Sequence, residues 1–116
     1  LAVAQTPRAR LEAIVRGSFA ASNFTPDTIG SWLNFYVLAL SSGPARRLHR
    51  IYAKRLRSNL CHALRPLVGT RADNLGAQTA ALIDGLYLHQ GLSPTVPDGD
   101  TAIRQVMSLL DRELKG

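Results

Sequence analysis

Cysteine, methionine and aromatic residues are scarce in this chain of 116 residues. Cys61 is the single cysteine and Met107 the single methionine. One thiol cannot form an intrachain disulfide, so we expect a reducing compartment, namely the cytoplasm. Because no methionine stands at position 1, we also expect the chain to begin partway through a longer protein.

Long hydrophobic runs and strand-like alternation are also missing. The longest mainly apolar stretches fall well short of the roughly 20 residues that span a bilayer, and we expect no membrane partner. Ala, Leu and Arg are abundant, and they favour helices because they lose little rotamer freedom there. Since a chain of this length suffices for one core, the sequence predicts a single all-α domain over residues 1–116.

Capping residues and prolines divide the chain into five helical segments. Thr6 and Thr25 each precede a proline, which is well suited to the first helical turn, and Ser42 is followed by Gly and Pro. Pro66 should end or kink the third helix because it removes a hydrogen bond. The predicted five-helix bundle has helices over residues 7–22, 26–41, 44–67, 71–92 and 100–115.

The apolar faces of these helices differ. The last helix has a single stripe, the pattern of a helix packed on one side. The fourth has two packable faces, which indicates either a partner on one side or burial on both. The second, IGSWLNFYVLAL from Ile29, is apolar around most of its circumference and is predicted to run through the middle of the bundle.

Positive charge is concentrated on the third helix, in a chain of net charge +6. At about 100° per residue, most of its cations share one sector, which we interpret as a solvated stripe: Arg46, Arg47, Arg50, Lys54, Arg57 and Arg65. Few aromatic residues interleave with them, so the stripe is not typical of a nucleic-acid reader. Arg55 and Asn59 fall at or within the apolar face and are predicted to turn inward, either to tie helices together or to line a ligand cavity.

Catalytic and metal-binding patterns are not evident. His49, His62 and His89 lie too far apart for a local metal motif, and one cysteine cannot begin a zinc knuckle. Cys61 and His62 are adjacent and therefore point in different directions on a helix. We expect no catalytic residues, no metal and no cofactor.

Aromatic side chains share one side of the second helix, where Trp32, Phe35 and Tyr36 lie close in phase. Tyr52 faces the predicted core from the third helix, and Tyr87 can join from the fourth. Such a stripe is either ordinary core or an aromatic box for a cation, whose charge is attracted to the ring faces. In the second case Asp84 could supply the counter-charge.

Three phrases carry a family resemblance. SWLNFYVLAL, RRLHRIYAKRLRSNL and AALIDGLYLHQGLS resemble, in the same order and spacing, the ligand-binding domain of TetR-family repressors, and most closely the BetI subgroup, which governs the conversion of choline to glycine betaine. The similarity runs from about Arg10 to Leu114. The RLRSNL and IDGL segments are its most specific parts.

The resemblance implies the C-terminal ligand-binding and dimerisation domain of a homodimeric transcriptional repressor. Its operator DNA would be bound by an N-terminal helix-turn-helix domain that this chain lacks. Choline or a related quaternary ammonium compound is the implied effector. The alternatives are a relative that senses another small ligand, or a small helical adaptor or enzyme.

The implied sites combine this resemblance with the helical faces. The ligand-binding candidates are Trp32, Phe35, Tyr36, Tyr52, Arg55, Asn59, Asp84 and Tyr87. The last two helices would form the dimer interface, with candidates Ala77, Ala80, Ala81, Leu88, Val106, Met107 and Leu110.

Overall fold

The structure, a computed structural model, describes residues 6–21 and 23–115. This part contains helices and no strand, which confirms the all-α prediction. Four helices begin and end within one residue of the predicted bounds, whereas α1 stops at Ser18, four residues early, where the chain turns and buries Phe19. The elements are α1 (Pro7–Ser18), α2 (Pro26–Ser41), α3 (Gly43–Val68), a 3-10 turn (Gly69–Arg71), α4 (Ala72–Leu92) and α5 (Gly99–Lys115).

The predicted capping residues begin three of these helices. The hydroxyls of Thr6, Thr25 and Ser42 each accept a hydrogen bond from the backbone N–H three residues ahead, at 3.1 to 3.3 Å. These bonds satisfy N–H groups that have no partner within the helix. Asp98 caps α5 in the same way, with its carboxylate 3.2 Å from the N–H of Thr101.

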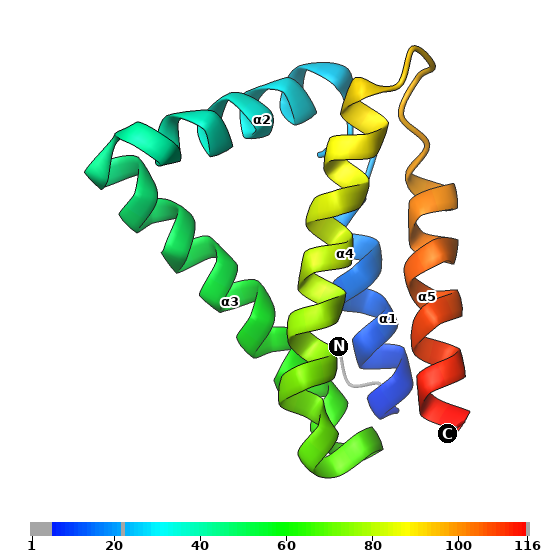
Figure 1. Cartoon of the computed structure of the whole chain (residues 1–116). Helices are drawn as coiled ribbons and strands as arrows, with labels where there is room; N and C mark the ends of the chain where they lie inside the picture. Colours follow the sequence, from blue (N-terminus) through cyan, green and yellow to red (C-terminus); the bar gives the residue numbers. More distant parts are fainter. Residues whose placement is uncertain (1–5, 22, 116) are drawn as a thin grey trace, which may run out of the picture.

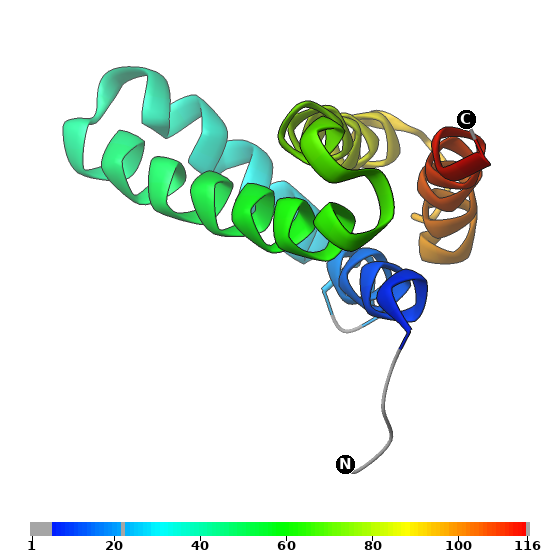
Figure 2. The ribbon, with the colours of Figure 1, turned by 90° about the horizontal axis from the view of Figure 1, so that it is seen from below.

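Helices α1, α4 and α5 pack beside one another together with the C-terminal half of α3 (Figures 1 and 2). Their shared core includes Leu11, Leu64, Ile83 and Leu110, each at most 2% exposed. Arg8 ties the outer surfaces of α1 and α5 together through two hydrogen bonds to Asp111, at 2.8 and 2.9 Å. None of the helices described is long and apolar enough to cross a bilayer.

Helix α2 lies at the edge of the molecule, so the prediction that it runs through the middle of the bundle is wrong. Figure 1 shows α2, α3 and α4 as three sides of a triangle, with the α2–α3 corner pointing away from α1 and α5. Ile29 is the one buried residue of α2. The apolar circumference of α2 is therefore divided between the interior of this triangle and an exposed outer surface.

Helix α5 packs by its apolar stripe on the chain's own core. Val106 and Leu110 are fully buried there and Met107 is 7% exposed. These three residues were predicted at the dimer interface, and the structure corrects that prediction. A helix with one apolar stripe has used it once it packs inside its own domain, so a second copy could reach only the other face of α5.

Candidate functional site

A cavity of about 340 Å³ lies between α2, α3 and α4. Its volume is at the lower end of the range for small-molecule sites. Five of the predicted ligand-binding residues line it: Trp32, Tyr36, Tyr52, Asp84 and Tyr87. The end of α1 closes one side of the cavity through Gly17 and Ser18.

The aromatic rings of the cavity stand at steep angles to one another. The ring of Trp32 meets that of Tyr52 edge to face, with centroids 5.5 Å apart and an interplanar angle of 81°. Tyr36 lies 6.1 Å from Trp32 on the same helix and 5.4 Å from His49, almost perpendicular to the imidazole. Rings from α2 and α3 thus line one small volume, and the faces of such rings attract a cation.

Asp84 is the one carboxylate among the residues that line this cavity. It reaches the cavity from α4, and its Oδ1 accepts a hydrogen bond of 3.3 Å from the hydroxyl of Tyr36. Partial burial raises the pKa of Asp84, while the Tyr36 hydrogen bond and the nearby His49 act to lower it. No ion pair among residues 6–21 and 23–115 involves Asp84, so a cationic ligand would supply its counter-charge.

Tyr87 joins the cavity to the end of α1. Its ring packs against Phe19 and Phe24, with centroids 5.5 and 5.0 Å away, and its hydroxyl donates a hydrogen bond to the carbonyl of Ser18. Burial raises the pKa of Tyr87, and the negative charge of Asp84 raises it further. The hydroxyl therefore stays protonated and remains a donor to α1.

Phe35 lies outside the main cavity. It lines a shallow hollow of about 350 Å³ between α2 and α3, together with Leu48 and one side of Trp32 and Tyr52. Its ring contacts Trp32 and Tyr52, with centroids 5.7 and 6.4 Å away. The structure thus places Phe35 behind Trp32 and Tyr52, where it supports the rings that line the cavity.

Arg55 and Asn59 are both exposed, so the prediction that they turn inward is wrong. The buried face of α3 is formed by Leu60, Ala63 and Leu64. One residue along a helix turns the side chain by about 100°, which carries Asn59 away from the direction of Leu60. Neither residue lines the cavity.

His49 is the main cavity residue that the sequence did not indicate as one. It lies three residues before Tyr52 on α3 and therefore projects from the same face one turn away. That spacing was the available signal. Ala80, predicted at the dimer interface, also lines the cavity.

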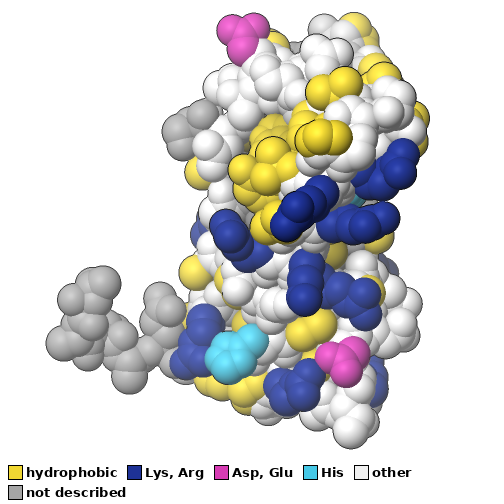
Figure 3. All heavy atoms as spheres, turned by 90° about the vertical axis from the view of Figure 1, so that its left-hand side faces the viewer, with side chains coloured by type: hydrophobic (Ala, Val, Ile, Leu, Met, Phe, Trp, Pro, Cys, Tyr) yellow, Lys and Arg dark blue, Asp and Glu magenta, His cyan; other side chains and the backbone are white. Residues whose placement is uncertain are grey.

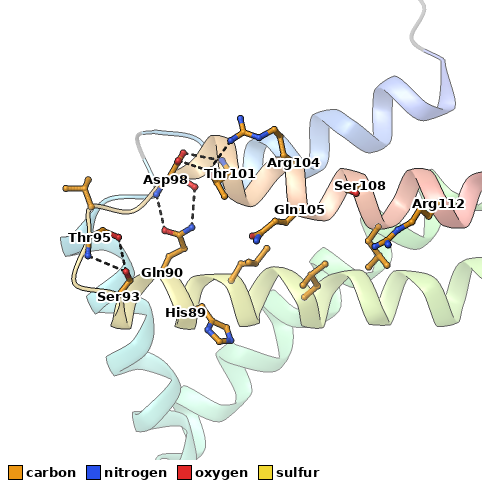
Figure 4. A pocket seen from close by; sticks show the side chains of 14 residues that line it. His89, Gln90, Ser93, Thr95, Asp98, Thr101, Arg104, Gln105, Ser108 and Arg112 are labelled. Carbon is orange, nitrogen blue, oxygen red and sulfur yellow. Dashed lines mark hydrogen bonds between the residues drawn. The ribbon is translucent and has the colours of Figure 1, made fainter.

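A second and larger hollow, of about 1160 Å³, lies between the outer faces of α4 and α5 (Figure 4). Leu82 and His89 line it from α4, and Gln105, Ser108 and Arg112 line it from α5. It is open and more polar than the aromatic cavity. Its shape fits a broad contact surface better than a small ligand.

The remaining predicted interface residues lie on α4. Ala81 and Leu88 are exposed, the latter by 46%, and Ala77 is partly buried. None of the three lines the α4–α5 hollow. No three His, Cys, Asp or Glu side chains among residues 6–21 and 23–115 gather closely enough to hold a metal ion.

The sequence profile of a family described as "BetI-type transcriptional repressor, C-terminal" matches residues 7–115, which include the whole cavity and the α4–α5 hollow. The chain belongs to this family. The resemblance found in the sequence is thereby confirmed, and the matched residues include those of both the aromatic cavity and the α4–α5 hollow.

Curated relatives support the assignment. The protein "HTH-type transcriptional regulator BetI" of Brucella suis is 43% identical over 114 residues, which is 97% of this BetI-type chain and 58% of the relative. The protein of the same name from Rhizobium meliloti is 49% identical over 90 residues, 77% of this chain and 44% of the relative. The chain thus spans about half the length of the relatives it matches. These relatives are named as regulators, in agreement with the prediction that the chain is not an enzyme. No solved structure matches the chain significantly.

Proposed function

We propose that this BetI-type domain binds choline or a related quaternary ammonium compound in the cavity between α2, α3 and α4. The observation that carries the proposal is the combination of Trp32, Tyr36 and Tyr52 with a single carboxylate, Asp84, in one cavity of about 340 Å³. Aromatic faces attract a cation and accommodate its methyl groups. Asp84 offers the opposite charge at short range.

The proposed ligand must be a cation of small size. A quaternary ammonium group donates no hydrogen bond, so a cavity built from ring faces suits it better than one built from acceptors. Glycine betaine carries a carboxylate beside its ammonium group, and that carboxylate would meet Asp84. The cavity should therefore favour choline over betaine.

The domain is proposed to act as a homodimer through the outer faces of α4 and α5. The support is the open hollow that both helices line. A Ser108→Arg substitution should place a bulky charge in this hollow and lower the mass measured by light scattering at tens of micromolar protein. Ser58→Arg, which adds the same group to an exposed position on α3, is the matched control. A parent chain that is already a monomer would contradict the interface.

We further propose that ligand binding controls operator DNA through an N-terminal helix-turn-helix domain of a longer cytoplasmic protein, and so regulates glycine betaine synthesis genes. The ligand must bind one arrangement of the DNA-binding domains more tightly than another, since equal affinity for both would shift nothing. The hydrogen bond from Tyr87 to the end of α1 gives the cavity a direct contact with the helix nearest the N-terminus. Residues 1–116 should give no sequence-specific gel shift.

Calorimetric titration with choline, betaine aldehyde and glycine betaine tests the ligand. Choline and betaine aldehyde, both cations, should release or absorb heat and change the fluorescence of Trp32, the single tryptophan. Glycine betaine should bind more weakly. Absence of heat with unchanged Trp32 fluorescence for all three would contradict a quaternary ammonium ligand and favour a relative that senses another molecule.

A further inference from the structure

One side of the aromatic cavity carries hydrogen-bonding groups that the rest of the chain leaves free. Tyr36 donates to Oδ1 of Asp84, at 3.3 Å, and no group among residues 6–21 and 23–115 donates to Oδ2 of the same carboxylate. His49 lines the cavity beside Tyr36, with ring centroids 5.4 Å apart and an interplanar angle of 87°. We refer to Asp84 and His49 as the polar end of the cavity.

The imidazole of His49 is likewise available to a ligand. Neither of its ring nitrogens has a hydrogen-bond partner in the part of the chain that the structure describes. A neutral imidazole offers one donor and one acceptor. His49 is also close enough to Asp84 to lower the pKa of that carboxyl through its charge. Both side chains can therefore reach the same part of a small ligand.

Polar groups on the α1 side of the cavity are already engaged. The hydroxyl of Tyr87 donates to the carbonyl of Ser18, and the hydroxyl of Ser18 donates to the carbonyl of Ile14, at 3.1 Å. Asp84 is the one carboxylate that lines the cavity. A hydrogen bond to an ionised acceptor is stronger than one between neutral groups, so Oδ2 of Asp84 is the strongest free acceptor that a ligand meets there.

A quaternary ammonium group cannot donate to this acceptor, because it has no N–H. Its attraction to Asp84 is one of charge, and the surroundings reduce that attraction. No Asp or Glu occurs between Asp27 and Asp73, whereas eight of the 14 Lys and Arg residues lie in that interval, and Lys and Arg far outnumber Asp and Glu on the face shown in Figure 3. Charge also does not distinguish one quaternary ammonium compound from another, so selectivity requires a shorter-ranged interaction.

We propose that the cavity selects quaternary ammonium compounds that carry a hydroxyl close to the cationic nitrogen. The hydroxyl donates to Oδ2 of Asp84 and accepts a hydrogen bond from His49, while the rings of Trp32 and Tyr52 hold the ammonium group. A site built to bind a hydroxyl in this way rejects an analogue that lacks it, because its own polar groups then stay unpaired. This inference rests on the proposed function and narrows its ligand class.

The test is calorimetric titration of residues 1–116 with choline and with propyltrimethylammonium, in which a methyl group replaces the hydroxyl. Choline should bind about three- to tenfold more tightly, because a hydrogen bond gained in exchange for one to water contributes about that factor. Equal binding of the two compounds would overturn this inference and leave the quaternary ammonium site standing. Absence of binding by both would overturn the site itself, and this inference with it.

The methyl ether of choline tests the direction of the hydrogen bond. Its oxygen can still accept from His49, but it has no hydrogen to donate to Asp84. The ether should therefore bind more weakly than choline and at most about threefold more tightly than butyltrimethylammonium, which has the same chain length and controls for the added size. An ether that binds as tightly as choline would contradict donation to Asp84.

Variants locate the recognition of the hydroxyl within the cavity. The measured quantity is the ratio of the association constants of choline and propyltrimethylammonium on one variant, which a general loss of stability does not change. Asp84→Ala should bring this ratio close to one, whereas Asp84→Asn, which keeps an acceptor oxygen, should lower both affinities and retain part of the ratio. His49→Phe should lower the ratio at least about twofold. His62→Phe, at an exposed position of α3 outside the cavity, is the matched control and should leave it unchanged.

Two further variants make the assignment to the polar end falsifiable. Asn23 and Tyr52 also line the cavity and carry polar groups. A ratio that falls to one in Asn23→Ala or Tyr52→Phe but not in Asp84→Ala would place the hydroxyl on another side of the cavity and overturn the proposal. An unchanged ratio in both Asp84→Ala and His49→Phe, with the helical circular dichroism of the parent chain, would overturn it as well.

Discussion

The hydroxyl of Tyr36 on α2 donates a hydrogen bond to Asp84 on α4, across 48 residues of sequence and 3.3 Å of space. This contact joins two sides of the α2–α3–α4 triangle at the candidate ligand cavity. It holds the carboxylate beside the aromatic rings while leaving its charge available. The cavity therefore has a defined negative end at Asp84, and the effect of this charge on ligand affinity can be measured.

Removal of that charge should weaken choline binding. Asp84→Asn keeps the size of the side chain but loses the attraction to a cation, which for a partly exposed pair amounts to about 1 kcal/mol, or roughly fivefold in affinity. Calorimetry with choline measures the loss. Asp73→Asn, which removes an exposed carboxylate paired with Arg65 far from the cavity, should leave the affinity unchanged. Equal effects of the two substitutions would show that Asp84 has no local role.

Choline affinity should fall in acid, and the fall should begin at a higher pH than for an ordinary aspartate. Burial raises the pKa of Asp84, so its proton returns before the reference pKa of about 3.9 is reached. The neutral acid no longer attracts a cation, so binding is strong above the raised pKa and is lost as pH falls through it. Calorimetry over a pH series measures this dependence.

Two variants control the pH experiment. Asp84→Asn should bind weakly at every pH and show a flatter profile. His49→Gln removes the one imidazole that lines the cavity, so its profile isolates the contribution of Asp84. A profile that is identical in the parent chain and in Asp84→Asn would rule out the carboxylate as the titrating group.

Choline affinity should depend on Trp32 more than on Phe35. Trp32→Leu removes a ring face from the cavity and should cost about 1 to 2 kcal/mol in choline affinity, as expected for a partly desolvated cation–π contact. Phe35→Leu removes a neighbouring ring that lines the outer hollow and should cost at most a few tenths of that. Binding constants of the two variants compare the positions directly. A larger loss for Phe35→Leu would place the ligand in the outer hollow.

Gly76 should be intolerant of a methyl group. A Cβ built there would lie 2.5 Å from the Sγ of Cys61, so Gly76→Ala should lower the free energy of unfolding by about 1 to 3 kcal/mol through overpacking. Cys61→Ala in the same chain should recover part of that loss. Urea unfolding measures both variants.

Gly30 provides the matched control for Gly76. It also lies inside a helix, but nothing within 4 Å would meet its Cβ, so Gly30→Ala should raise stability by about 0.5 to 1 kcal/mol. If Gly76→Ala were as stable as Gly30→Ala, the close approach of α3 and α4 at Cys61 would be wrong.

The candidate site was only partly predictable from the sequence. Trp32, Tyr36, Tyr52, Asp84 and Tyr87 do meet in one cavity, because each projects from a helix side that faces the same triangle. Helical phase gives angles between residues of one helix, but it does not say which sector a neighbouring helix will cover. Arg55 and Asn59 were misplaced for that reason, and His49 was missed although it lies one turn from Tyr52.

The sequence by itself determined the helices and the family. Thr6, Thr25 and Ser42 satisfy local N–H groups, and capping depends on neighbours only three residues away. The tertiary structure alone decided what each apolar face covers. The apolar stripe of α5 is buried in the chain's own core, whereas Val37 and Leu40 of α2 are exposed. This difference arises because burial depends on the packing of segments that are distant in sequence, and hydrophobicity alone does not specify the partner.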